Sequence, residues 1–316
     1  MSQNTKIKEL LELYDLPVEE LINISSEITK ENFSNTVEFC SIISAKTGKC
    51  GEDCKYCSQS GHHKAKIEVH PLISVQDVKA SAESAKENGA SRFCVVTSGR
   101  KPEADDFKNI LKMIELVANI DGLHSCCSLG ILDEKQVKQI KEAGAERYNH
   151  NLNTCKSFHK DICSTHDYED RINTVKLIQS YGIEACTGGI IGMGETRRQR
   201  VELALELAEL NPVSVPVNFL HPVVGTPLEN KFNAITEEEI LKTLAIFRIV
   251  LPKALIRYAG GRFSRFSKES QLLGIKAGVN ALLVGNYLTT TGITPDDDIK
   301  LIQNAGMSIE GASTNG

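Results

Sequence analysis

Short apolar segments rich in β-branched residues recur along the chain from about Val37, and amphipathic stretches separate them. Such segments between polar turns are typical of buried strands. The pattern predicts strands at Glu38–Ile43, Phe93–Val96, His124–Ser128, Arg147–Asn149, Ala185–Gly188, Val213–Val217, Leu255–Tyr258 and Ala281–Val284.

Three of the amphipathic stretches begin with a polar residue that can cap a helix and a partner three positions later. The pairs are Ser74 with Asp77, Asp133 with Gln136, and Thr236 with Glu239. Apolar residues follow each pair at helical spacing, and Gly89, Gly144 and Pro252 mark the expected helix ends. The stretches between the strands are therefore expected to be helices.

Strands that alternate with helices predict a parallel sheet. Eight such units in about 250 residues have the size of a (β/α)8 TIM-type barrel, although a doubly wound open sheet fits the same pattern. We expect one domain over residues 1–316, with a helical extension at 1–36 and a frayed tail at 310–316.

The composition is that of an ordinary globular protein, with 316 residues of which 41% are hydrophobic and 24% charged. A formal net charge of −5 gives no reason to expect nucleic acid or an anionic membrane as a partner. The acidic first thirty residues resemble neither a secretory signal nor a transit peptide, so a cytoplasmic location is expected. In a cytosol the ten cysteines stay reduced, and thiols there are more often metal ligands than disulfides.

Cys50, Cys54 and Cys57 form a C-x3-C-x2-C cluster in the loop after the first predicted strand. Three thiolates on one short loop can bind three irons of a [4Fe–4S] cluster and leave the fourth iron open to another molecule. A structural zinc site would need four ligands, and no second pair of cysteines at such spacing follows. The loop would lie at the C-terminal end of its strand, where barrel active sites are built. The spacing therefore favours a redox cluster.

An aromatic residue, Tyr56, precedes the last of these cysteines, and the whole motif resembles the signature of the radical S-adenosylmethionine (SAM) superfamily. The resemblance implies that the open iron binds the amino and carboxylate groups of SAM. It also implies that one electron from the cluster cleaves SAM to methionine and a 5′-deoxyadenosyl radical. Such a radical attacks unactivated C–H bonds that no side-chain base can deprotonate.

Further motifs resemble those of the biotin synthases, in the order and at the intervals of that family. They are Tyr148–Thr154, Gly188–Thr196, Val215–Asn218 and Gly225–Leu228. The resemblance runs from about Val37 to Thr291. It implies that the chain inserts sulfur into dethiobiotin to give biotin, with two SAM molecules used per product and the sulfur drawn from a second iron–sulfur cluster.

Cys94, Cys126 and Cys186 lie within three predicted strands, and Arg257 lies within a fourth. A buried cysteine is most often a small hydrophobic residue, but three on separate strands of one barrel could converge. In the biotin synthases the matching cysteines and arginine bind an auxiliary [2Fe–2S] cluster. The role of Arg257 rests on this resemblance alone, because arginine is normally a permanent cation with no lone pair to donate.

The resemblance also assigns residues to SAM and to the substrate. Asn151 and Asn218 match residues that contact the ureido ring of dethiobiotin, and amides suit a neutral cyclic urea because it offers both donors and an acceptor. Arg171 matches the residue that pairs with the SAM carboxylate. The expected SAM site further includes Tyr56, Asn151, Asn153, Gly188, Ile190 and Glu195. Taken alone, the asparagines would be turn residues and Arg171 a solvated helix residue.

The chain departs from the family pattern in three places. Position 153 is Asn where many members have an Asp that contacts the SAM ribose, and a single acceptor oxygen should weaken that contact. Cys127 directly follows Cys126, and a second glycine stands in Tyr258–Arg262. The auxiliary cluster could therefore be [2Fe–2S] or larger. The other cysteines, Cys40, Cys155 and Cys163, are expected to be structural.

Two alternatives stay open at this point. Another small radical SAM enzyme, one that rearranges carbon skeletons or matures hydrogenases, would not need Cys94, Cys126 and Cys186 together. A non-catalytic iron–sulfur or zinc-binding protein would have no use for the Gly188–Glu195 motif. An electron donor such as flavodoxin or ferredoxin, and a homodimer, are implied by the family resemblance only.

Overall fold

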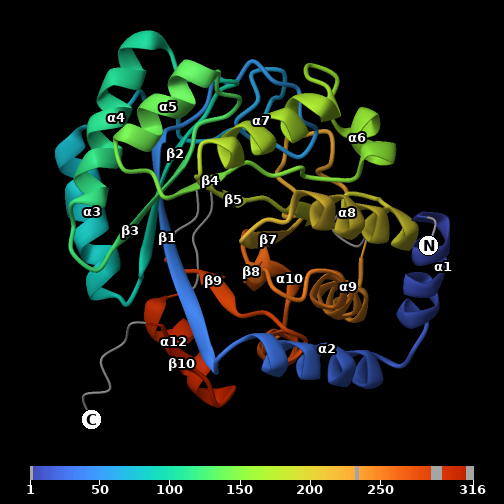
Figure 1. Ribbon diagram of the computed structural model, residues 1–316. Coiled ribbons are helices and arrows are strands. Elements are labelled where there is room, and N and C mark those ends of the chain that lie inside the picture. Colours follow the sequence, from blue (N-terminus) through green and yellow to red (C-terminus); the bar gives the residue numbers. More distant parts are fainter. Residues whose placement is uncertain (1–2, 232–234, 286–293, 311–316) are drawn as a thin grey trace.

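The computed structural model describes residues 3–231, 235–285 and 294–310, and its strands form one parallel sheet (Figure 1). The strands are β1 Thr36–Lys46, β2 Arg92–Thr97, β3 His124–Ser128, β4 Arg147–Asn149, β5 Glu184–Cys186, β6 Gly189–Ile191, β7 Ser214–Phe219, β8 Leu255–Tyr258, β9 Ala281–Leu283 and β10 Ser308–Ile309. Each of β1 to β4 pairs with the next strand along the chain, β5 pairs with β7, and β7 to β9 continue the order, while β6 pairs with β7. Pairing of β9 with β1 closes the sheet into a barrel. The TIM-type fold is confirmed, and the open doubly wound sheet is excluded.

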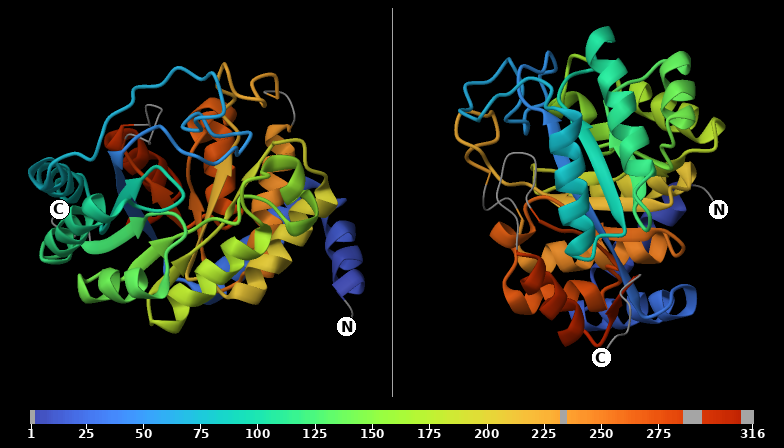
Figure 2. Two further views of the ribbon diagram at one scale, coloured as in Figure 1. Left: turned by 90° about the horizontal axis from the view of Figure 1, so that it is seen from above. Right: turned by 90° about the vertical axis from the view of Figure 1, so that its left-hand side faces the viewer.

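The helices lie around the outside of the strands (Figures 1 and 2). They are α1 Gln3–Tyr14, α2 Val18–Asn32, α3 Val75–Glu87, α4 Ala104–Ala118, α5 Glu134–Glu142, α6 Lys156–Ile162, α7 Tyr168–Ser180, α8 Arg197–Leu210, α9 Glu237–Val250, α10 Arg262–Arg265, α11 Lys268–Lys276 and α12 Pro295–Asn304. In the described part of the chain, no helix has the length and hydrophobicity of a membrane span.

Helix starts follow the capping signals in the sequence. Ser74 and Asp133 cap α3 and α5 with reciprocal bonds to Asp77 and Gln136, and the Thr236 hydroxyl accepts from the Glu239 amide at the start of α9. These side chains bond to backbone N–H groups that have no partner inside the helix, which fixes where each helix begins. The predicted helices are confirmed at these three places.

The N-terminal helices α1 and α2 pack against α8 and α9, with Tyr14 fully buried, and so form the predicted extension. At the other end, β10 pairs with the first residues of β1, a strand that the sequence pattern did not predict. Residues 311–316 of the expected tail lie outside the described residues. The single-domain organisation stays a prediction.

The predicted strand Ala185–Gly188 differs from the structure, in which β5 ends at Cys186 and β6 begins at Gly189. The neighbouring strand β7 contains Pro216, which has no N–H to offer a sheet ladder. The Gly188 amide donates to the side chain of Asn151 at 3.0 Å. The break between β5 and β6 therefore lies beside Pro216 of β7, and the Asn151 side chain bonds to the backbone within it.

Candidate active site and metal centres in the barrel

A cavity of about 340 Å³ lies inside the barrel. The predicted site residues in its wall are Tyr56, Cys57, Cys94, Cys126, Asn151, Asn153, Cys186, Ile190, Asn218 and Arg257. They come from the loop after β1 and from most of the strands or the turns that follow them. The fold thus brings the cysteine loop, the strand cysteines and the amides to one enclosed space.

An ion-pair network occupies the inner end of this space. The Glu38 carboxylate, 6% exposed, accepts from Arg147 at 2.8 Å and from Arg257, and it lies 3.6 Å from Arg92. Burial alone would raise the pKa of Glu38, but Arg257, Arg147 and Arg92 outweigh it and lower this pKa to about 2. Glu38 is therefore held as an anion among three guanidinium groups.

The cysteine thiols form the next layer of the cavity. Cys94, Cys126 and Cys186 line it, as the sequence predicts for residues that face the barrel axis, and each is at most 6% exposed. A hydrogen bond with Cys94 lowers the pKa of Cys126 against the opposing effect of burial. The Asn149 amide donates to the Cys186 sulfur at 3.4 Å.

Cys40 lines the same cavity, although the sequence favoured it as a structural residue. It lies on β1, two positions after Glu38, and packs against Cys94 and Cys126. Alternate residues of a strand share a face, so the inward direction of Glu38 also turns Cys40 inward. That periodicity was the signal in the sequence that could have identified it.

Cys127 points the other way. It packs outside the barrel wall in a buried cluster with Phe107, Ile110 and Tyr148. This orientation agrees with strand alternation, because Cys126 faces the cavity. Cys127 is therefore an ordinary core residue.

Arg257 is held by three partners. Its Nε donates to Ser214 at 3.3 Å, its Nη1 to the Leu282 carbonyl at 3.1 Å, and its Nη2 to Glu38. Arg92, by contrast, has Nε and Nη1 buried without a hydrogen-bond partner among the described residues. Arg92 lies in an ion pair with Glu38, yet these two N–H groups make no hydrogen bond within the described part of the chain, and such cationic donors in the cavity wall suit an anionic group such as a thiolate-bound iron–sulfur cluster.

The C-x3-C-x2-C loop lies over the cavity, between the end of β1 and α3. Cys57 lines the cavity, Cys54 is buried and Cys50 is half-buried. Backbone bonds within the loop fold it on itself, from Cys50 N to Gln59 O at 3.0 Å and from Cys57 N to Cys54 O at 2.9 Å. Three thiols on one ordered loop fit a cluster in which each thiolate binds a different iron.

A second segment, at 162–166, holds this loop in place. The Asp53 carboxylate accepts from the Ser164 amide at 2.9 Å, and the Glu52 carboxylate bonds to Thr165 at 2.7 Å and to His166. Lys55 N donates to Ile162 O at 3.0 Å. The two polar residues between Cys50 and Cys54 thus fasten the loop to the end of α6.

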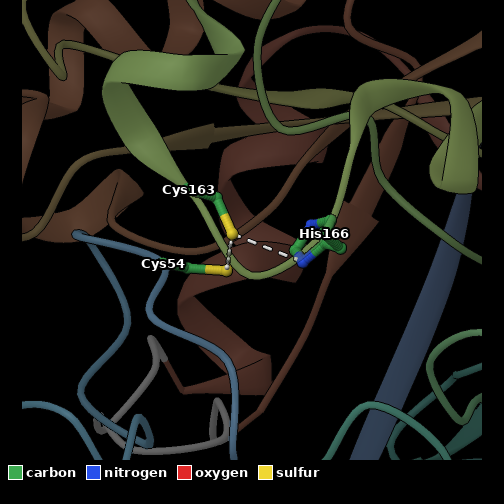
Figure 3. Close-up of side chains that lie close together, drawn as sticks. All are labelled: Cys54, Cys163 and His166. Carbon is green, nitrogen blue, oxygen red and sulfur yellow. Dashed lines mark hydrogen bonds between the residues drawn. The ribbon is translucent and has the colours of Figure 1, made fainter.

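Cys163 in that segment contacts Cys54, and their sulfur atoms are 3.7 Å apart (Figure 3). His166 Nδ1 lies 3.3 Å from the Cys163 sulfur. Among the described residues, these three are the group of His, Cys, Asp and Glu side chains whose ligand atoms all lie within 4.8 Å of one another. Cys163, expected to be structural, therefore lies beside the cysteine loop.

Polar side chains ring the cavity above the thiols. The Asn151 oxygen accepts from Gly188 N at 3.0 Å, and the Asn218 oxygen accepts from Gly260 N at 3.0 Å. The Asn218 NH₂ group also donates to the Gly189 carbonyl at 3.2 Å and keeps one further N–H, while the orientation of Asn151 leaves its NH₂ group to face a ligand. The Arg171 guanidinium donates to the backbone carbonyl oxygen of Asn151 at 2.8 Å.

Asn153 joins this ring to the cysteine loop. With its amide oxygen turned toward the nearby donors, that oxygen accepts from Arg171 at 3.1 Å and from the Tyr56 hydroxyl at 2.5 Å. Its φ of 68° lies in the left-handed region, which Asn and Asp enter more easily than most residues.

The predicted SAM residues Gly188 and Glu195 lie outside the cavity wall. A Cβ at Gly188 would lie 2.0 Å from the Pro216 carbonyl oxygen, so glycine is needed for the close approach to β7. The Glu195 carboxylate accepts from the Gly192 and Met193 amides at 2.8 Å and pairs with Arg200 at 3.3 Å. In this structure Glu195 orders the turn after β6.

Known protein families match most of the chain. The radical SAM superfamily matches residues 45–207, and the biotin and thiamin synthesis associated domain matches residues 216–308. Biotin synthase from Acetivibrio thermocellus is 45% identical over 291 residues, which are 92% of this chain and 90% of that protein. Biotin synthase from Clostridium perfringens is 41% identical over 304 residues, or 96% of this chain and 94% of that protein.

The chain belongs to the biotin synthase family. The resemblance drawn from the motifs is therefore confirmed, and the superfamily brings SAM and a [4Fe–4S] cluster with it. Neither the other small radical SAM enzymes nor a non-catalytic metal protein remains as an alternative.

Solved structures share the fold at low sequence identity. Methylornithine synthase has a TM-score of 0.81 and 18% identity, and it covers 96% of this chain and 93% of its own. A maturase of the [FeFe]-hydrogenase has a TM-score of 0.79 and 15% identity, and it covers 98% of this chain and 76% of its own. These likenesses support the barrel and not the biotin synthase activity.

Proposed function

We propose that this chain converts dethiobiotin to biotin, with the sulfur supplied by an auxiliary iron–sulfur cluster inside the barrel. One observation carries the proposal: a single cavity joins Cys57 and Tyr56 at its mouth to Cys94, Cys126 and Cys186 at its inner end. A radical formed at the mouth and a sulfide held below would then act on a substrate bound between them.

In this proposal Cys50, Cys54 and Cys57 hold the [4Fe–4S] cluster, and Cys94, Cys126, Cys186 and Arg257 hold the auxiliary cluster. When bound, the outer cluster supplies one electron for SAM cleavage and the auxiliary cluster supplies sulfide. The three guanidinium groups around Glu38 favour an anionic cluster by their charge.

Asn151 and Asn218 are proposed to fix the ureido ring of dethiobiotin. Asn149 pairs with Cys186, and Asn151 comes two residues after Asn149. Asn218 pairs with Ile190, which comes four residues after Cys186. Both asparagines therefore lie nearer the C-terminal ends of the strands than the Cys186 thiol does. A ring held there leaves the rest of the substrate over the thiol layer. Arg171, Asn153, Tyr56 and Ile190 are proposed to bind SAM near the mouth, together with Gly188 and Glu195 from the turn around β6.

The proposal includes a one-electron donor such as flavodoxin or ferredoxin, because SAM cleavage consumes one electron. It also includes a homodimer, on family resemblance, and a reducing cytoplasm, which ten free thiols suit. Sedimentation of the anaerobic protein tests the dimer.

The function is tested with anaerobically reconstituted protein, a reductant, SAM and dethiobiotin, by measuring 5′-deoxyadenosine and biotin. Cys50→Ala should abolish both products. Cys94→Ala should remove biotin while uncoupled SAM cleavage persists, because the outer ligands are intact. Cys155→Ala, which removes a core thiol outside the cavity, should change neither product. Undiminished biotin from the Cys94 variant would contradict the proposed sulfur source.

A further inference from the structure

Three side chains of metal-ligand type meet where the cysteine loop touches the segment after α6 (Figure 3). Cys54 comes from the loop after β1, and Cys163 and His166 follow α6 with two residues between them. Each is at most 7% exposed, and their ligand atoms all lie within 4.8 Å of one another. The proposed function uses Cys54 alone, so it gives Cys163 and His166 no part.

The spacing of these atoms is that of ligands around one small ion. Zn–S bonds of about 2.3 Å at tetrahedral angles put two sulfurs about 3.8 Å apart, and a Zn–N bond of about 2.0 Å puts the nitrogen about 3.5 Å from a sulfur. The Cys54 and Cys163 sulfurs are 3.7 Å apart, and His166 Nδ1 lies 3.3 Å from the Cys163 sulfur. One ion therefore fits among the three side chains with little movement, and a water molecule can complete its tetrahedron.

Hydrogen bonds hold the three ligands in this arrangement. The Cys163 amide donates to the His159 carbonyl at 3.0 Å, and the His159 ring bonds to the His166 carbonyl at 3.1 Å. The amide that follows Cys54 donates to the Ile162 carbonyl at 3.0 Å. Ligands that are already fixed lose little conformational freedom when an ion binds.

Two carboxylates lie beside the ligands. Asp53 Oδ1 is 3.2 Å from the Cys163 sulfur, and the Glu52 carboxylate bonds to His166 Nδ1. An ion at Nδ1 would replace the proton in that second bond, while Glu52 would keep the Thr165 hydroxyl, which donates to it at 2.7 Å. Thiolates and imidazole are ligands that Zn²⁺ prefers, and the neighbouring carboxylates add negative charge that favours a cation.

We propose that, in protein without the [4Fe–4S] cluster, Cys54, Cys163 and His166 bind one divalent transition-metal ion, with Zn²⁺ as the best fit. Cys54 is also a ligand of the [4Fe–4S] cluster in the proposed function, and the next step rests on that function. A Cys54 thiolate held on one ion with Cys163 and His166 is not free to bind iron of the cluster. The ion therefore has to leave before the cluster forms, and Zn²⁺ slows cluster assembly through Cys163.

The metal site is tested with full-length apoprotein in which Cys50 and Cys57 are replaced by Ala, so that Cys54 has no cluster to join. Co²⁺ is the probe, because its visible and near-ultraviolet absorption reports tetrahedral geometry and thiolate ligands, and Zn²⁺ then competes with it. The barrel thiols remain in every variant, so the Co²⁺ that they bind cancels in the difference spectra. Circular dichroism verifies that each variant folds.

In this background Cys163→Ala should lose the thiolate absorption of one Co²⁺ ion, and Cys163→Ser replaces it if the alanine variant does not fold. His166→Ala should weaken Zn²⁺ binding by at least about tenfold. The control Cys155→Ala removes a core thiol elsewhere and should match the parent. Equal Co²⁺ absorption in the parent and the Cys163 variant would overturn the site.

A second experiment separates this inference from the proposed function. The wild-type apoprotein and Cys163→Ala are each reconstituted with iron and sulfide, with and without one equivalent of Zn²⁺, and growth of the [4Fe–4S] absorption is followed. Zn²⁺ should slow assembly several-fold in the wild type and much less in Cys163→Ala. Equal slowing of both proteins would overturn the link between the site and cluster assembly. A wild-type protein that forms no [4Fe–4S] cluster without Zn²⁺ would overturn the proposed cluster ligands, while the Co²⁺ spectra would still decide the metal site.

Discussion

Replacing Glu38 by Gln tests the ion-pair network that closes the inner end of the cavity. The variant keeps the size of the side chain and removes the carboxylate that Arg92, Arg147 and Arg257 share. Glu184 is the remaining carboxylate near Arg147 and Arg92, and its side chain is 44% exposed. The three buried guanidinium groups would therefore lose most of the negative charge that neutralises them.

The size of the effect follows from the pKa of Glu38. A fall from 4.5 to about 2 corresponds to about 3 kcal/mol of folding free energy, within the range of about 3–5 kcal/mol for breaking a buried pair. For 316 residues the entropy of unfolding is about 0.7 kcal/mol per degree, so the apoprotein should lose about 5–8 °C in its melting temperature.

The assay is urea and thermal unfolding of the apoprotein, followed by circular dichroism. The pKa of Glu38 is lower in the folded state, so its stabilisation is complete above about pH 4.5 and is lost as pH falls toward about 2. The difference in unfolding free energy between Glu38→Gln and the parent should therefore shrink as pH falls through that window. Glu184→Gln, at a half-exposed site, should cost less than about 1 kcal/mol. A Glu38 variant as stable as the parent at pH 7, or a gap that does not vary with pH, would refute the reasoning.

Three further predictions concern the cavity and its loop. Asn153→Asp should be tolerated and should keep or tighten SAM binding, because Asp also accepts a φ of 68° and faces Arg171; SAM titration that shows a loss of more than about tenfold, or 1.4 kcal/mol, would contradict this. Gly188→Ala should lower the free energy of unfolding in urea by at least about 2 kcal/mol, because its Cβ would lie 2.0 Å from the Pro216 oxygen. The control Gly51→Ala should stay within about 0.5 kcal/mol of the parent, because a Cβ there meets nothing within 4 Å. Oxidation of the apoprotein with diamide should join Cys54 to Cys163, whose sulfurs are 3.7 Å apart; peptide mass spectrometry that finds Cys54 joined only to Cys50 or Cys57 would show that the loop rearranges.

Sequence periodicity was sufficient for a parallel sheet with helices between its strands, because buried parallel strands are short apolar runs and the helices between them carry explicit caps. The choice between a closed barrel and an open sheet needed the pairing of β9 with β1. Strand alternation also accounts for the outward direction of Cys127, which follows the inward-facing Cys126. The break between β5 and β6 was not predicted, because it lies where both strands pair with β7, and pairing partners are not readable from one sequence.

The candidate site was predicted less completely than the fold. Glu38 and Cys40 were overlooked because each, taken alone, has an ordinary structural interpretation, and only the closure of β9 onto β1 turns both toward Arg257. The contact of Cys163 with Cys54 was missed for a similar reason, since it depends on how the segment after α6 folds over the cysteine loop. Tertiary contacts of this kind decide which of ten cysteines share a cavity.

The central claim is that the sulfur of biotin comes from a cluster held by the barrel cysteines. The most direct measurement is a single turnover of protein reconstituted with isotopically labelled sulfide, in buffer free of other sulfide, followed by mass spectrometry of the biotin formed. The account predicts that most of the biotin carries the label and that a protein with Cys94→Ala, Cys126→Ala and Cys186→Ala forms none. Unlabelled biotin from the labelled protein would contradict it.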